Sequence, residues 1–269
     1  MEILFTTDVL IAFLTLTFLE IILGIDNVIF ISIVTGKLPE EKRKKATQIG
    51  LFLAMFMRIA LLFGITWLTQ MKETLFSIGW GWFSANINGQ ALILLSGGIF
   101  LIYKSTKEIH EKVNHIEYIT DSKDATHKRS VSYMSVISQI LMIDLIFSVD
   151  SILTAVGMTN GLYSQNVELW GQRPELFVMV AAVIVSVVVM MIFAVPVGRF
   201  VNKNPSIQIL ALSFLILIGF MLTTESMHLS DAVLAEQHIG AVPKGYLYFA
   251  IAFSLAVEFI NMKMRKRSV

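Results

Sequence analysis

Hydrophobic residues along this chain gather in long runs, and polar residues gather between the runs. Seven runs approach the length of a membrane span, because a helix rises about 1.5 Å per residue and needs about 20 residues to cross a bilayer. The third run is short, and Trp80, Trp82 and Phe83 precede it, which we interpret as an interfacial aromatic anchor that leads into a turn. The predicted spans are roughly 8–34, 46–69, 89–104, 131–158, 175–198, 205–227 and 244–262.

Composition changes this picture from a set of apolar helices to a membrane protein. Apolar residues make up 55% of the 269 residues, and charged residues make up 15%, whereas a typical soluble domain carries about 25% charge. Such a surface cannot be that of an ordinary soluble enzyme, a coiled coil or a disordered chain. We therefore predict an all-α, multi-pass integral membrane protein.

The lysines and arginines predict its orientation. If the seven spans are correct, seventeen of the 21 basic residues lie on the side of the first loop, around residues 35–45, and the C-terminus. Basic residues concentrate on the cytoplasmic side of membrane proteins, so the N-terminus is predicted outside and the C-terminus inside. The net charge of +1 gives no global field that would attract nucleic acid.

The segment 105–130 is the only sizeable loop that we predict. Ile109, Val113, Ile116 and Ile119 recur there at spacings of three and four residues, which favours a short amphipathic helix on the membrane surface about as much as a solvated linker. We expect one transmembrane domain without a second soluble domain. Its predicted parts are a first repeat at about 8–104, the linker at 105–130, a second repeat at about 131–227 and a seventh helix at about 244–262.

Two of the predicted spans share a sequence pattern at an offset of 124 residues. The segment EIILGIDN, which begins at Glu20, corresponds to DLIFSVDS, which begins at Asp144. Acids coincide at the first and seventh positions, and Gly98 and Gly219 mark a weaker likeness between the third and sixth spans. Because three spans separate the copies, the second copy crosses the membrane in the opposite direction. The pattern predicts a 3+3 inverted repeat plus one helix, which is typical of secondary transporters.

Acidic residues inside the predicted spans are the main candidates for function, since a charge at a helix centre costs about 2.5–3.5 kcal/mol. Asn27 and Ser151 lie seven residues after Glu20 and Asp144 and therefore share a helix face with them. Asp26 and Asp150 lie about 120° around the helix and about 9 Å along it, in opposite directions across the membrane. The predicted cation site comprises Glu20, Asp26, Asn27, Asp144, Asp150 and Ser151.

Four further residues are secondary candidates for this site. Arg58 could balance an acid or hold two helices together, and Ser148 can satisfy a backbone group where its helix unwinds. Glu225 and Glu258 lie near span ends, where each could simply reach the interface. Gly98 and Gly219 are predicted to allow close helix packing rather than ligand binding.

Ligand chemistry narrows the ion that such a site would take. The chain has no cysteine, and its five histidines lie outside the predicted spans. Oxygen donors alone favour Mn²⁺, Ca²⁺ or Mg²⁺ over Zn²⁺ or Cu⁺. Neighbouring carboxylates also raise one another's pKa, so exchange of a metal for protons is physically reasonable. We expect the ion as transported cargo, with no permanently bound cofactor.

Several segments resemble the TerC-type integral membrane proteins, a family named for tellurium resistance. FLEIILGIDNVIFI and MIDLIFSVDSILTAVGM resemble its paired signatures, and YLYFAIAFSLAVEFIN and KEIHE resemble its compact bacterial branch, which lacks appended regulatory domains. The resemblance implies a bacterial inner-membrane location and, from several members, a link to Mn²⁺ export and to metal insertion into secreted proteins. The acids and amide of the family's motifs correspond here to Glu20, Asp26, Asn27, Asp144, Asp150 and Ser151.

We therefore expect a transporter that exports a divalent cation, with Mn²⁺ favoured, and we do not expect an enzyme. The first alternative is a membrane factor that transports nothing and aids the assembly or metal loading of other proteins. An intramembrane aspartyl protease would need paired aspartates such as Asp26 and Asp150, but the Gly-x-Gly-Asp context of such enzymes is missing. The expected partners are the cation and the lipid bilayer, and a homodimer is compatible with a sequence that does not fix the oligomeric state.

Overall fold

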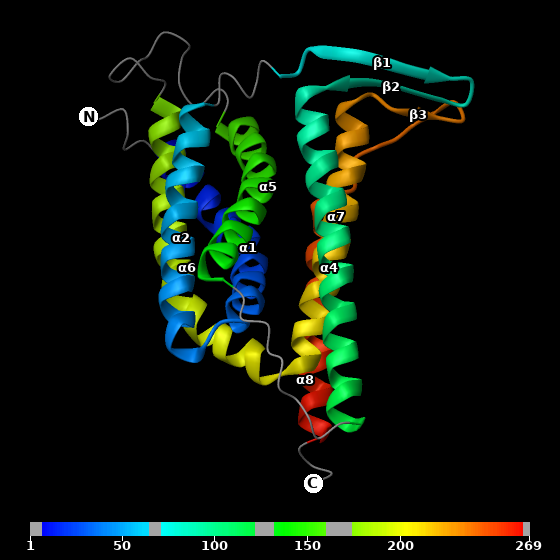
Figure 1. The fold of residues 1–269 in the computed structure, drawn as a ribbon. Helices are drawn as coiled ribbons and strands as arrows, with labels where there is room; N and C mark the ends of the chain where they lie inside the picture. The colour runs from blue at the N-terminus through cyan, green and yellow to red at the C-terminus, as the bar shows by residue number, and fades with distance from the viewer. Residues whose placement is uncertain (1–6, 65–70, 122–131, 160–173, 266–269) are drawn as a thin grey trace. The chain divides into compact units, whose positions relative to one another are not determined.

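A computed structural model describes residues 7–64, 71–121, 132–159 and 174–265 of the chain. These residues form seven helices and four short strands (Figure 1). The helices are α1 (Thr7–Gly36), α2 (Glu40–Phe63), α4 (Gly89–Asp121), α5 (Tyr133–Thr159), α6 (Pro174–Lys203), α7 (Pro205–Leu229) and α8 (Lys244–Arg265). The strands are β1 (Thr74–Trp80), β2 (Phe83–Asn88), β3 (Val233–Leu234) and β4 (Gln237–His238).

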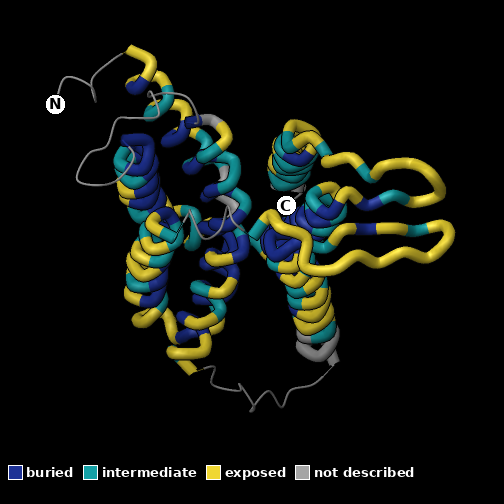
Figure 2. The backbone as a smooth tube through the Cα atoms, turned by 90° about the horizontal axis from the view of Figure 1, so that it is seen from above, coloured by how far each residue is buried: buried dark blue, intermediate teal, exposed yellow. Residues whose placement is uncertain are grey.

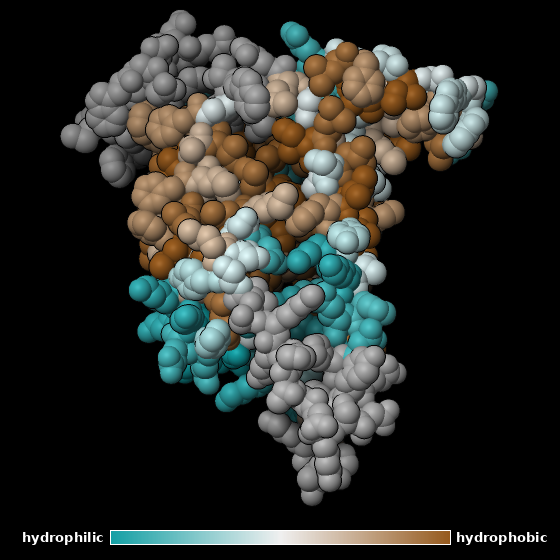
Figure 3. Space-filling view, viewed as in Figure 1, coloured by the Kyte–Doolittle hydropathy of each residue, from teal (hydrophilic) through white to brown (hydrophobic). Residues whose placement is uncertain are grey.

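Six of these helices are long and apolar enough to cross a membrane, which confirms the predicted helical membrane class. They are all of the described helices except α4, whose apolar first half is the predicted third span. Figure 3 shows hydrophobic side chains over the middle of the helices, and hydrophilic side chains around the end of α1 and the start of α2. The seven-span count and the orientation stay predictions.

The segment after the third span departs from our expectation. Residues 105–121 continue α4 without a break to Asp121, so they form neither a separate surface helix nor an irregular linker. The physical reason is that helical hydrogen bonds continue wherever no proline, glycine or cap interrupts them, and 105–121 contain neither proline nor glycine. The rest of the expected linker, residues 122–130, lies outside the described residues.

Backbone contacts divide the chain into two compact units. Unit 1 comprises Met1–Gln70 and Ser130–Asn202, and unit 2 comprises Met71–Arg129 and Lys203–Val269. Unit 1 therefore takes the first two helices of each predicted repeat, and unit 2 takes the third helix of each. In both units the buried residues line the helix faces that pack together (Figure 2). The single-domain description of the chain stays a prediction.

In unit 1, α5 packs against both α1 and α2. Ile31, Ile140, Ile143 and Ile152 are fully buried among these helices. Small residues bring the backbones close together: a Cβ at Gly50 of α2 would meet the side chain of Ile140 at 2.9 Å. The helices of unit 1 thus hold the middle of α1, α2 and α5 against one another.

In unit 2, α4 and α7 lie side by side along much of their length (Figure 1). Their closest approach joins Gly98 and Gly219, where a Cβ on either residue would lie 2.6 or 2.7 Å from the other's carbonyl oxygen. This confirms that both glycines serve close packing. Ser226 of α7 adds a hydrogen bond from its Oγ to the carbonyl of Ala91 at 2.7 Å.

The aromatic stretch before α4 forms a β-hairpin, where the sequence predicted only a turn, and its role as an interfacial anchor stays a prediction. Strands β1 and β2 pair antiparallel from Trp80↔Phe83 to Thr74↔Asn88, and β3 and β4 extend the sheet in the order β1-β2-β3-β4. Branched and aromatic residues alternate with small or polar ones here, which favours strands. The sheet belongs to unit 2 and adds a small β element to the helical fold.

Candidate functional site

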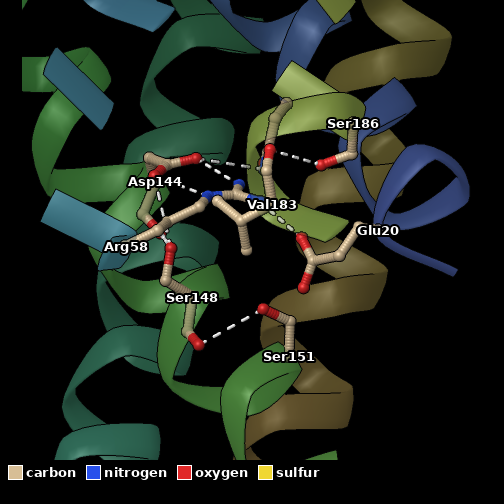
Figure 4. A network of polar contacts seen from close by, with 8 residues as sticks. Glu20, Arg58, Asp144, Ser148, Ser151, Val183 and Ser186 are labelled. Carbon is tan, nitrogen blue, oxygen red and sulfur yellow. Dashed lines mark hydrogen bonds and ion pairs between the residues drawn. The ribbon is translucent and has the colours of Figure 1, made fainter. Parts of the chain in front are cut away.

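A buried arginine joins two of the predicted acids inside unit 1 (Figure 4). Arg58 of α2 donates from Nη1 to Oε2 of Glu20 on α1 at 2.7 Å. It also donates from Nε to Oδ2 of Asp144 on α5 at 3.0 Å, and its Nη2 contacts Oδ1 of the same carboxylate. The guanidinium therefore binds Asp144 with two nitrogens and Glu20 with the third, a geometry that lysine cannot reproduce.

Asp144 receives further hydrogen bonds from its own helix and from α1. Ser148 Oγ lies 3.2 Å from Oδ2 of Asp144 and donates to the Asp144 carbonyl at 2.6 Å. Asn27 Nδ2 makes a longer contact of 3.5 Å with Oδ1 of Asp144. Asn27, which the spacing places on the face of Glu20, and the secondary candidate Ser148 thus belong to one network with Asp144 and Arg58.

The three charged groups of the network are almost completely removed from solvent. Glu20 is 5% exposed, and Arg58 and Asp144 are each 3% exposed. Burial of a charge costs several kcal/mol unless partners compensate it. One guanidinium compensates one carboxylate, so the network carries a formal charge of −1 when both acids are ionised. A further positive charge, from a proton or a cation, would complete the balance.

Neutral oxygen atoms surround this charge. Asn27 is 3% exposed, and its Oδ1 is buried without a hydrogen-bond partner. Ser151 is also buried, and its Oγ contacts the Ser148 carbonyl at 3.3 Å. Because an orphaned buried acceptor is costly, Asn27 Oδ1 is well suited to accept a proton donor or to bind a cation.

Gly24 leaves space for a side chain of α6 next to the same face of α1. A Cβ at Gly24 would lie 2.1 Å from Sδ of Met190, a side chain that is 4% exposed. Gly24 lies four residues after Glu20, one turn further along α1. The structure therefore assigns this glycine a packing role that accommodates Met190.

The remaining predicted ligands are placed differently. Asp150 is half-buried on α5, and its carbonyl accepts a hydrogen bond from Thr154 at 3.0 Å. Asp26 belongs to α1, but its side chain lies outside the described part of the structure. Among the side chains that are described, no group of three or more His, Cys, Asp or Glu is arranged to hold a metal ion. The structure thus brings Glu20 and Asp144 together, while convergence of all four acids stays a prediction.

The two secondary acids near span ends belong to unit 2. Glu225 is half-buried on α7, and Glu258 is half-buried on α8. Asn261 Nδ2 contacts Oε2 of Glu258 at 3.5 Å. Both therefore belong to a compact unit other than the one that holds the Arg58 network.

Two buried polar residues of α6 escaped the sequence analysis. Ser186 is fully buried near the network, where its Oγ donates to the Val183 carbonyl at 2.9 Å (Figure 4). Glu175 is 5% exposed in the first turn of α6. Its position at the start of a predicted span resembles an interfacial residue, and a serine inside an apolar helix is too common to stand out.

Comparison with known proteins adds the family. Residues 5–268 match the integral membrane protein TerC family. The chain is 43% identical to the UPF0053 protein of Haemophilus influenzae, an alignment that covers 95% of this chain and 94% of that protein. It is 44% identical to the UPF0053 inner membrane protein YgdQ of Escherichia coli, with 94% and 92% covered.

This chain also aligns over its whole length with about half of a longer relative. The chain is 38% identical to the UPF0053 inner membrane protein YoaE of Escherichia coli over its whole length, which is 46% of that protein. No solved structure matches the chain. The relatives named as inner membrane proteins and the membrane-length helices together identify a multi-pass bacterial inner-membrane protein. With its match over nearly all of its residues, the chain belongs to the TerC family of integral membrane proteins.

Proposed function

We propose that this protein exports a divalent metal cation, with Mn²⁺ as the favoured ion, through a site around Glu20 and Asp144. The observation that supports the proposal most is the charge balance of the buried network. Arg58 offsets one of two carboxylates, and a cation in transit would find the remaining negative charge where water does not compete for it. Such a charge is costly to keep and is typical of ion pathways in membrane proteins.

The donor atoms favour hard or borderline ions. The carboxylates of Glu20 and Asp144, the buried Oδ1 of Asn27 and the hydroxyls of Ser148 and Ser151 are all oxygen donors. Mn²⁺, Mg²⁺ and Ca²⁺ share this preference, so Mg²⁺ and Ca²⁺ are the competing ions. The two aspartates at the seventh position of each motif, Asp26 and Asp150, would extend the pathway about 9 Å toward opposite sides of the membrane.

Arg58 acts in this proposal as a tethered cation. It contacts both carboxylates, and metal binding would require it to release them. A divalent ion that displaces both the guanidinium and one proton leaves the two carboxylates with the same net charge of zero, which avoids the cost of a bare carboxylate pair. A proton on one carboxylate can provide the remaining balance, so the proposal includes coupling to protons. The two inverted repeats would then expose the site alternately to the two sides.

The first test measures metals in cells that overproduce the protein. Mass spectrometry should find less cellular manganese than in cells with an empty vector. Glu20→Gln, Asp144→Asn and the pair Asp26→Asn with Asp150→Asn should each restore the manganese content, because each removes charge from the pathway. Glu41→Gln makes the same chemical change at an exposed position of α2 and should export as the unmodified protein does. Unchanged manganese, or export that survives these substitutions, would contradict the proposal.

A membrane factor without transport is the second candidate, and two observations favour it. No three-acid metal cluster is present among the described side chains, and the ion pairs of Arg58 could simply hold α1, α2 and α5 together. Purified protein in liposomes distinguishes the two. Entry of Mn²⁺ that a trapped fluorescent chelator reports supports the transporter, and an absence of flux with correctly inserted protein supports the factor.

A further inference from the structure

The hairpin of β1 and β2 separates apolar and polar residues onto opposite faces. Residues that pair directly across two antiparallel strands point to the same side of the sheet. Three of the pairs are wholly apolar: Phe76↔Ile87, Ile78↔Ala85 and Trp80↔Phe83. The other three pairs carry only small or polar residues: Thr74↔Asn88, Ser77↔Asn86 and Gly79↔Ser84.

A bulge helps to keep this separation regular. The register shifts by one residue between Thr74 and Phe76, which places Thr74 opposite Asn88 on the polar face. Ser77 Oγ donates to Oδ1 of Asn86 across that face at 2.7 Å. Strand β3 continues the apolar face, because Leu234 pairs with Phe83. The sheet is therefore amphipathic over more than one strand pair.

The apolar face is only partly buried against the rest of unit 2: on β2, Ala85 is buried and Phe83 and Ile87 are half-buried, whereas its residues on β1 and β3 are more exposed. Phe76 is 49% exposed, Ile78 39%, Leu234 43% and Trp80 72%. Trp82, in the two-residue turn between the strands, is 65% exposed. Figure 2 shows the hairpin as an exposed extension of the chain. An exposed apolar patch of this kind marks a surface that another medium or molecule covers.

Hydrogen bonds hold the sheet at the end of a membrane-length helix. The backbone N–H of Asn86 donates to the Ser230 carbonyl at 2.7 Å, and the side-chain Nδ2 of Asn88 donates to the Leu229 carbonyl at 2.6 Å. Leu229 is the last residue of α7. In Figure 1 the strands run across the ends of α4 and α7 rather than along them. Because α7 is long enough to cross the hydrocarbon, a sheet at its end would lie at the level where hydrocarbon meets water if α7 spans the bilayer.

We propose that the apolar face of this hairpin lies in the interfacial layer of the lipid bilayer and anchors unit 2 to the membrane surface. Trp80 and Trp82 then lie at headgroup level, where tryptophan concentrates in membrane proteins. Residues 74–88 contain no Asp, Glu, Lys or Arg, so no charge opposes insertion. The polar face with Ser77 and Asn86 turns toward water, as in an interfacial amphipathic helix.

Pairing with a second copy of the chain is the main rival for this surface. Among the described residues, no strand pairs with the outer edge of β1, and free edges can pair with other strands. Edge pairing, however, would leave the apolar face itself uncovered. A bilayer covers that face directly and continues over the exposed apolar residues of the adjacent helices, such as Leu92 of α4 and Phe220 of α7.

Tryptophan fluorescence of the reconstituted full-length protein tests the proposal. The chain has four tryptophans, and Trp67→Phe with Trp170→Phe leaves Trp80 and Trp82 as the reporters. The protein is placed in phosphatidylethanolamine–phosphatidylglycerol vesicles whose lipids carry bromine near the headgroup end of the acyl chains. We expect the brominated lipids to remove most of the emission and aqueous acrylamide to remove little of it.

Two variants give the matched comparison. Phe76→Ser puts a hydroxyl on the apolar face and should reduce quenching by brominated lipid, whereas Ser77→Ala on the polar face should not. Full quenching by acrylamide with none from brominated lipid would overturn the proposal. Protection from both quenchers that is lost when the vesicles are diluted with lipid would overturn it in favour of a second copy. If Phe76→Ser does not reconstitute, the quenching of the unmodified hairpin still decides the question.

Discussion

Arg58, Glu20 and Asp144 form one buried network of three charged groups. Acids inside apolar runs are conspicuous, so Glu20 and Asp144 could be selected from sequence alone. Their shared partner could not, because the pairings join residues 38 and 86 positions apart and depend on how α1, α2 and α5 pack. The sequence left open whether Arg58 balances one acid or holds two helices together, whereas the guanidinium contacts two acids on two different helices.

Removal of the arginine should therefore cost more than removal of the whole set. Arg58→Met leaves two buried carboxylates without their counter-charge, and loss of one partner of a buried ion pair costs about 3–5 kcal/mol. The triple variant Arg58→Met, Glu20→Gln, Asp144→Asn removes the stranded charges and should recover much of that loss. The Tm of the detergent-purified proteins measures both effects. An unaltered Tm for Arg58→Met would show that the network contributes nothing to stability.

Helices and strands differed in how well their boundaries could be predicted. Long apolar runs located five of the six membrane-length helices to within about five residues, since the bilayer sets their length. The prediction of 46–69 was less accurate, because α2 (Glu40–Phe63) begins and ends six residues earlier and its charged first turns carry no apolar signal. The hairpin was missed because the aromatic residues around Trp80 were interpreted by composition, although Phe76, Ile78 and Trp80 alternate with small residues. The continuation of α4 was missed because spacing at Ile109 and Val113 indicates a helix without indicating whether it is joined to the preceding span.

The crossing of α4 and α7 gives a prediction about whole elements. Gly98→Ala would place a Cβ 2.6 Å from the backbone oxygen of Gly219. The backbone cannot rotate away from this contact as a side chain can. We expect a loss of about 1–3 kcal/mol, typical of overpacking. Gly24→Ala meets the flexible end of Met190 and should cost less.

Gly157→Ala provides the matched control for this pair. A Cβ at Gly157 of α5 would meet nothing within 4 Å, and alanine is favoured over glycine in a helix by up to about 1 kcal/mol. Its Tm should equal or exceed that of the unmodified protein. A ranking in which Gly157→Ala is as harmful as Gly98→Ala would contradict the assigned role of the α4–α7 contact.

At the scale of the whole molecule, the distribution of basic residues predicts which side of the membrane each loop occupies. The chain has no cysteine, so a single introduced thiol reports its own location. Glu73→Cys, before β1, should react with a membrane-impermeant maleimide in spheroplasts. Glu41→Cys, at the start of α2, should react only after the membrane is opened. The reverse pattern would invert the predicted topology, and equal labelling would contradict the span count.

The interleaved units set an order for assembly during synthesis. Glu20 and Arg58 both belong to the part of unit 1 that is made first, so they can form a neutral pair as soon as α1 and α2 are in the bilayer. Asp144 joins only after the ribosome has made 86 more residues beyond Arg58, including α4. The buried negative charge therefore comes into being late, when α5 arrives. A chain interrupted before α5 would hold the balanced pair of Glu20 and Arg58 without Asp144, so the second half of the protein supplies the net negative charge on which the proposed ion site depends.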